Sequence, residues 1–190
     1  IQVRERLLKT LREAAAAALK QSSVERVAAL ASLAKPAAWG PVPVAHFAFE
    51  SVTNHTTPGA ATTNVFAQLH DGPEQVAGRV GQGLKFSGDN SAVIQGVGEF
   101  RRTDPFSLAC WLQPATAQDR AVVFHGSRSW TDSGSRGYEL VLEEGRPFFA
   151  LIHFWPGNAL AVRAREPLPL GEWSHLTITY DGSSRATGMR

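Results

Sequence analysis

The 190-residue chain contains 43% apolar and 9% aromatic residues, an ordinary balance for a soluble domain that buries a core. Its formal net charge is +2, but residues 1–35 contain seven Lys or Arg against three Glu, which leaves twelve basic and fourteen acidic residues in the remaining 155. This slight acidity argues against a nucleic-acid surface there. No apolar run reaches about 18 residues, so no membrane span is predicted. The only cysteine, Cys110, excludes a disulfide within the chain and a cysteine-rich zinc site.

The first 35 residues have a helical pattern. Apolar residues recur every three or four positions from Val3 to Leu19, and the five alanines at 14–18 add helix propensity. Ser22 and Glu25 form a capping box that predicts a second helix over residues 23–34. Because so narrow an apolar stripe cannot form its own core, residues 1–35 are expected to pack on the domain that follows, on a neighbouring domain or on a second copy. Their basic residues indicate a solvated face, or contact with acidic partners.

Residues 36–43 mark a boundary between two patterns. Three prolines in these eight residues favour an extended, semi-rigid connector. Helical periodicity before the connector gives way to alternation after it, so a domain is predicted over residues 44–190. Phe47 and Phe49 are expected on the core side of its first strand.

Between Gly81 and Asp181 the sequence consists of short alternating stretches separated by Gly, Asp or Pro. This spacing predicts an antiparallel sandwich or barrel, a class of fold that more often binds than catalyses. Glu144-Gly145-Arg146-Pro147 is expected to be a hairpin turn, and Leu176, Ile178 and Tyr180 are expected on the inward face of a strand. The expected core contains Phe47, Phe49, Leu84, Phe86, Phe106, Leu108, Trp111, Leu140, Leu176 and Ile178.

Five phrases occur in an order typical of one family: residues 46–50, 78–89, 106–112, 137–140 and 173–182. In this order they resemble the laminin-G-like branch of the concanavalin A-like lectin/glucanase superfamily. The resemblance implies a mainly β fold, a jelly-roll sandwich of two antiparallel sheets over residues 44–190. Modules of this kind continue beyond the phrase 188–190 with further strands, so C-terminal strands are expected to be missing. Strand edges left exposed in this way predict self-association, or pairing with further chain.

A narrower resemblance concerns residues 153–160 and 180–190. They are similar to the version of this module found in large planctomycete-type multidomain proteins that also contain a c-type cytochrome domain. That likeness implies an extracytoplasmic location, periplasmic or secreted. It also implies that residues 1–35 are the tail of the domain that precedes the module. This chain has no Cys-x-x-Cys-His haem site, so cytochrome chemistry would belong to another part of such a protein.

Catalytic patterns are weak. Glycosidases need two closely spaced carboxylates, and the nearest approach is Glu139 with Glu143 and Glu144, of which only Glu139 is expected within a strand. No serine lies in a Gly-x-Ser-x-Gly motif. The chain is therefore predicted not to be an enzyme, and a degenerate glycosidase is the least favoured alternative.

The resemblance also implies a calcium ion held at the rim by carboxylate, amide and backbone oxygens. Glu50, Asn54, Asp89 and Asn90 provide such oxygens, although the same residue types also serve in Asx turns and caps. The histidines show no ligand spacing. His46, His153 and His175 are expected to be polar groups on a sheet face.

Two tryptophans lie in polar, turn-rich segments. Trp130 and Trp155 are candidates for stacking on a sugar, with hydrogen bonds from Arg128, Asp132 and Asn158. The alternative is that each indole covers an edge of the sandwich. Trp111 and Trp173 belong to strand phrases and are expected to be structural.

Together these features predict a non-catalytic recognition module that binds carbohydrate within a multidomain protein. The alternative is an architectural insert that contacts neighbouring protein domains and binds no small ligand.

Overall fold

The computed structural model describes residues 43–60, 64–127 and 135–190. The chain divides into two compact units, Ile1–Pro43 and Val44–Arg190, and every strand of the described residues belongs to the second. The helices predicted in residues 1–35 and the connector up to residue 42 lie outside the described residues. In the described part, no helix has the length and apolar character needed to cross a bilayer.

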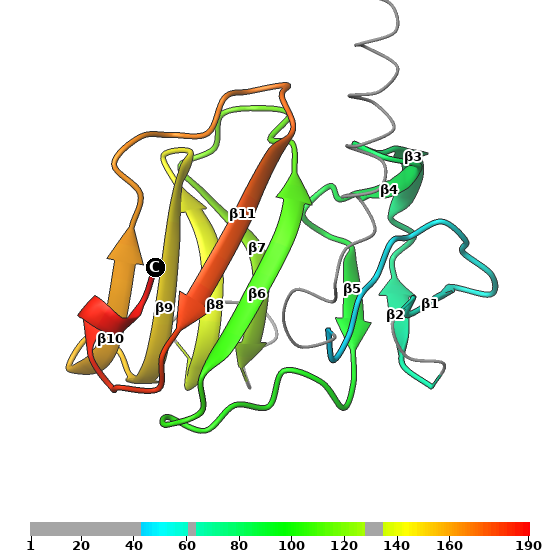
Figure 1. Cartoon of the computed structure of the whole chain (residues 1–190). Helices are drawn as coiled ribbons and strands as arrows, with labels where there is room; N and C mark the ends of the chain where they lie inside the picture. The colour runs from blue at the N-terminus through cyan, green and yellow to red at the C-terminus, as the bar shows by residue number, and fades with distance from the viewer. Residues whose placement is uncertain (1–42, 61–63, 128–134) are drawn as a thin grey trace, which may run out of the picture. The chain divides into compact units, whose positions relative to one another are not determined.

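The second unit is built from antiparallel strands, which confirms the predicted mainly β fold (Figure 1). The strands are β1 (Thr56–Pro58), β2 (Phe66–His70), β3 (Glu74–Ala77), β4 (Gln82–Lys85), β5 (Ser91–Ile94), β6 (Phe106–Leu112), β7 (Arg120–Ser127), β8 (Gly137–Glu143), β9 (Arg146–Phe154), β10 (Asn158–Arg163) and β11 (Ser174–Tyr180), followed by the 3-10 turn η1 (Ala186–Gly188).

Two sheets enclose the core. The larger has the order β10-β9-β8-β7, and the smaller pairs β11 with β6. Buried residues from both sheets contact one another between them: Phe106, Leu140, Phe149, Ile178, Tyr180 and Met189. Two further small sheets, β1-β2-β5 and β3-β4, are formed by residues before β6. The predicted sandwich is therefore present, with additional pairs of short strands ahead of it.

Register explains which side chains face the core of the smaller sheet. β6 and β11 pair without interruption, with Phe106 opposite Tyr180, Leu108 opposite Ile178, and Cys110 opposite Leu176. Directly opposed residues project from the same face of a sheet, and the faces alternate along each strand. Ile178 and Tyr180 are buried and Leu176 packs against the core, which confirms the predicted inward face of this strand.

The larger sheet is organised by a tight hairpin between β8 and β9. Glu144 and Gly145 have φ of 51° and 76°, both in the left-handed region that a two-residue type I′ turn requires. This confirms a hairpin turn here, although Arg146 and Pro147 of the predicted turn belong to β9. It also places Leu140 opposite Phe149, and both side chains are buried in the core.

Two of the predicted core residues, Trp111 and Phe86, are exposed, and the predicted first strand is absent from the part of the chain that the structure describes. Trp111 is 50% exposed, because β6 directs Phe106, Leu108 and Cys110 inward and an odd-numbered residue must then face outward. Phe86 is also exposed, since it lies one residue beyond the end of β4. The first strand expected around Phe47 and Phe49 is absent from the described residues. Phe49 has φ of 58°, which is incompatible with extended backbone, and the two rings stack on each other instead at 6.3 Å between centroids.

The buried hydroxyl of Tyr180 is expected to stabilise the fold. The Tyr180 side chain is 2% exposed, and its Oη donates to the carbonyl of Arg102 and accepts from the N–H of Ser184, both at 2.7 Å. Tyr180→Phe leaves both partners without the hydroxyl and should lower the free energy of unfolding by about 1–3 kcal/mol, measured by urea denaturation. Thr177→Ala, at an exposed position of the same strand, is the control and should change it by less than about 0.5 kcal/mol. Equal losses in the two variants would contradict this role.

Burial of Cys110 predicts a slow thiol reaction. Desolvation raises the pKa of the Cys110 thiol from 9.0 to about 11. Since the thiolate is the reactive form, a disulfide reagent at pH 8 should modify the folded chain at least about a hundredfold more slowly than the urea-unfolded chain.

The raised pKa of Cys110 also makes the stability of the fold depend on pH. Between about pH 9 and about pH 11 the unfolded thiol loses its proton while the folded thiol keeps it, so stability falls as pH rises through this window. Cys110→Ala should reduce that loss. Rapid modification of the folded chain at pH 8 would show that Cys110 is accessible.

Candidate ligand-binding site

The connection between β9 and β10 presents aromatic side chains to solvent. Trp155, Pro156 and Gly157 link the two strands, and Phe154 at the end of β9 pairs with Asn158 at the start of β10. Trp155 is 46% exposed and Phe154 is 68% exposed. We call Phe154, Trp155 and Asn158 the hairpin tip.

The Trp155 ring has a supporting neighbour within the sheet. Phe148 of β9 contacts it edge to face, with ring centroids 6.0 Å apart and an interplanar angle of 89°. Such a contact favours one orientation of the indole and leaves part of its surface to solvent. The exposed Asn158 provides an amide that can donate and accept hydrogen bonds on the same connection. The structure therefore brings two of the predicted ligand-binding residues, Trp155 and Asn158, together.

The other predicted ligand-binding residues cannot be placed. Trp130, Arg128 and Asp132 lie outside the described residues, so their position relative to Trp155 stays a prediction.

A second aromatic site was missed by the sequence prediction. On the outer face of the smaller sheet, Trp111 lies opposite His175 with ring centroids 4.8 Å apart, and the Arg79 guanidinium lies 5.6 Å from the centre of the indole. We call these three residues the Trp111 face. Strict alternation from Phe106 would have revealed that Trp111 faces outward. The contribution of Arg79, from the turn between β3 and β4, has no such sequence signal. Trp173, by contrast, is half-buried and lies near Gly83 of β4.

Two of the residues proposed for calcium, Glu50 and Asn90, accept hydrogen bonds from backbone N–H groups. Asn90 Oδ1 accepts from the N–H of Ser87 at 2.8 Å, a side-chain-to-backbone bond within one turn. Glu50 Oε2 accepts from the N–H of Gln82 at 3.3 Å, and Asn54 occupies a left-handed position with φ of 52°. Asp89 is exposed. Among residues 43–60, 64–127 and 135–190, no three His, Cys, Asp or Glu side chains are grouped to hold a metal ion.

The carboxylates considered for glycosidase chemistry take part in ion pairs. Glu139 is buried in the middle of β8, and its Oε1 lies 3.9 Å from Nη2 of Arg120. Glu144 lies in the β8–β9 turn and its Oε2 is 2.8 Å from Nη1 of Arg146. Arg163 Nη2 lies 3.5 Å from Oε2 of Glu143. Glu139 is thus within a strand as predicted.

Two of the three histidines expected in strands lie in strands. His153 is in β9 and His175 is in β11, whereas His46 lies in no strand.

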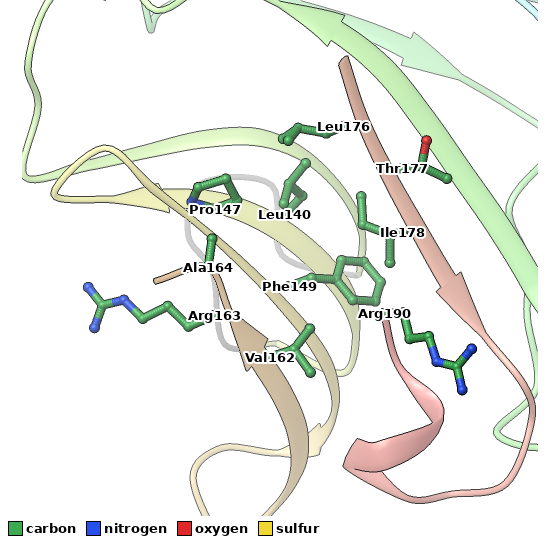
Figure 2. A pocket seen from close by; sticks show the side chains of 10 residues that line it. All are labelled: Leu140, Pro147, Phe149, Val162, Arg163, Ala164, Leu176, Thr177, Ile178 and Arg190. Atoms are coloured by element: carbon green, nitrogen blue, oxygen red, sulfur yellow. The ribbon is translucent and has the colours of Figure 1, made fainter. Parts of the chain in front are cut away.

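A cavity of about 280 Å³ opens between the two sheets beside β11 (Figure 2). Leu176 and Ile178 line it from β11, and Leu140, Phe149 and Val162 line it from the larger sheet. Arg163 and Arg190 are also part of its lining. No sequence pattern signals this cavity, because it depends on how far the two sheets lie apart at one edge.

Comparison with known proteins agrees with this architecture. A laminin G family model, described as the concanavalin A-like lectin/glucanases superfamily, matches residues 86–188. This segment spans β5 to β11 and includes both sheets of the sandwich. Neither the curated proteins nor the solved structures provided a match. Since the model matches more than half of the 190 residues, the chain belongs to the concanavalin A-like lectin/glucanases superfamily.

Proposed function

We propose that residues 44–190 form a non-catalytic recognition module that binds carbohydrate through the hairpin tip. The observation that supports this most is the half-exposed indole of Trp155, which is held edge to face by Phe148 and lies beside the exposed Phe154. Exposed aromatic surface at a strand connection has no role in the core. A sugar ring presents an apolar face that can stack on such an indole, while its hydroxyls bind polar groups such as the Asn158 amide.

Binding by this site is expected to be weak. A stacking contact contributes on the order of 1 kcal/mol beyond the area it buries, and one hairpin tip offers few hydrogen-bonding groups. Affinity would then rise through repetition of the sugar or tethering of several modules, which increases the effective concentration. Trp130, Arg128 and Asp132 would add to the site, a role that rests on their sequence alone.

The Trp111 face is a second candidate for the same function. Its indole is exposed to a similar degree, and the Arg79 guanidinium could bind an acidic sugar. In Figure 1 the β9–β10 connection lies at the bottom of the sandwich, whereas β6 ends and β11 begins at the top. The two sites are therefore separable by mutation.

The wider setting comes from the sequence resemblance. The module would belong to a larger extracytoplasmic protein of the planctomycete type that also contains a cytochrome c domain. A calcium ion near Asp89 and Asn90 would order the adjacent loops, although Asn90 would first have to release Ser87. The alternative is an architectural module whose exposed rings contact neighbouring domains instead of glycans.

Paired tryptophan variants test carbohydrate binding. A glycan array with acidic and neutral polysaccharides, run with calcium and with EDTA, would identify a ligand. Trp155→Ala should then weaken binding about fivefold, the loss that corresponds to about 1 kcal/mol, without changing the melting temperature. Trp111→Ala removes an indole of similar exposure elsewhere and should leave binding unchanged.

The reverse outcome, a loss only in Trp111→Ala, would move the site to the Trp111 face. Absence of glycan binding in both calcium conditions would reject the carbohydrate function and favour the architectural alternative.

A further inference from the structure

The Trp111 face contains an arginine that has no carboxylate partner. In Figure 1 the β3–β4 pair lies at the end of the sandwich where β6 ends and β11 begins, and from there Arg79 reaches the Trp111 indole. Two arginines of the larger sheet, Arg146 and Arg163, pair with glutamates at 2.8 and 3.5 Å. Among residues 43–60, 64–127 and 135–190, no Asp or Glu forms an ion pair with Arg79. The N–H donors of its guanidinium are thus available to an anion from another molecule.

The turn that contains Arg79 is held by hydrogen bonds. It joins β3 to β4, and the Gly78 N–H donates to the Gly81 carbonyl at 2.9 Å. Gly81 has φ of 61°, and the Glu50 carboxylate occupies the space that a side chain at this position would take. The same carboxylate accepts from the N–H of Gln82 at 3.3 Å, so the backbone of the hairpin engages its charge. Arg79 is therefore presented from an ordered turn, which reduces the entropy lost when it binds a partner.

The sheet surface around Trp111 contains no acidic side chain. Register and alternation place six residues on the outer face of the smaller sheet: Ser107, Ala109, Trp111, His175, Thr177 and Thr179. None of them is Asp or Glu, and all except Trp111 and His175 have small side chains. A surface of small residues lets the main chain of a partner come close to the two exposed rings. The positive charge of Arg79 is not countered by this face, so charge complementarity favours an acidic partner.

Exposed apolar groups beside Arg79 favour a polypeptide over an acidic sugar. Val80, the next residue of the same turn, is 79% exposed, and Trp111 is 50% exposed. A sugar presents hydroxyls over most of its surface and needs several acceptors, whereas the outward neighbours of Trp111 in the sheet are Ala109, His175 and Thr177. A polypeptide can place apolar side chains on such a surface next to a carboxylate. Tryptophan and arginine are also the residue types that dominate the binding energy of protein interfaces.

We propose that the Trp111 face, together with Val80, is a docking surface for an acidic polypeptide segment of a partner protein. An aspartate or glutamate of that segment accepts hydrogen bonds from the Arg79 guanidinium, whose planar fork can bind a carboxylate with two N–H groups. An apolar or aromatic side chain next to this carboxylate packs on the exposed part of the Trp111 indole and on Val80. This surface is separate from the hairpin tip, so the proposal does not depend on carbohydrate binding there.

Synthetic polypeptides test this docking surface. The full chain is titrated against immobilised poly(Glu,Tyr), a random copolymer that combines carboxylates with aromatic rings, and against polyglutamate of the same length. Both polymers offer carboxylates to Arg79, but only poly(Glu,Tyr) offers rings to Trp111 and Val80. Poly(Glu,Tyr) should therefore bind about fivefold more tightly than polyglutamate.

Single variants assign the binding to the proposed residues. Arg79→Gln should weaken binding of poly(Glu,Tyr) by about tenfold or more, because it removes a charge-assisted hydrogen-bonded pair. Arg165→Gln removes the same charge from an exposed position between β10 and β11, and this matched control should keep the affinity within about twofold of the parent. Trp111→Ala should lower the affinity for poly(Glu,Tyr) to that for polyglutamate. If Trp111→Ala lowers the melting temperature, Val80→Ser tests the apolar contact at a position that is 79% exposed.

Three results would overturn the docking surface. One is that the parent chain does not bind poly(Glu,Tyr), or binds it no more tightly than polyglutamate. Another is an equal loss of affinity in Arg79→Gln and Arg165→Gln, which would mean that binding follows the overall charge of the chain. The third is binding to polygalacturonate at least as tight as to poly(Glu,Tyr), with the same dependence on Arg79, which would make this face a site for acidic sugars.

Discussion

The packing of Phe106 between the two sheets is the constraint on which the rest of the sandwich depends. Its ring stacks on Phe100 at 4.2 Å between centroids and contacts Tyr180 at 5.5 Å and Phe149 of the larger sheet at 6.3 Å. With Phe106 inward, alternation determines the face of every other residue in β6, and the uninterrupted register transfers this phase to β11. The outward position of Trp111 and the inward positions of Leu176 and Ile178 follow from this single contact.

Local chemistry makes part of this fold predictable. The inward face of β11 and the Glu144-Gly145 turn follow from alternation and from the left-handed preference of glycine, which act over a few residues. The position of Trp111 is also predictable in principle, since Phe106 and Trp111 cannot share a face of a regular strand. The hydrophobicity of Trp111 favours burial in the core, whereas its place in the alternation of β6 directs it to the surface. The alternation decides. The alternation around Phe49 predicts a strand that the structure does not contain. The alternating pattern carries no signal for a positive φ at a residue other than glycine.

Contact between distant segments has no comparable signal in the sequence. The pairing of β6 with β11 joins residues more than sixty positions apart, and only that pairing places His175 beside Trp111. Arg79 reaches the same indole from the β3–β4 turn. The hairpin tip is easier to predict, because Trp155 and Asn158 lie on one short connection. The cavity depends on the separation of two sheets at one edge, a quantity that no short stretch of sequence encodes.

Contact between Trp155 and carbohydrate at the hairpin tip is tested most directly by the chemical shift of each indole N–H. The shifts are followed while ¹⁵N-labelled protein is titrated with an oligosaccharide selected by the array. Stacking on Trp155 predicts a saturable shift of its indole signal and of the Asn158 side-chain amide, while the signal of the half-buried Trp173 stays in place. A titration that saturates with the Trp155 and Asn158 signals unmoved would contradict this contact.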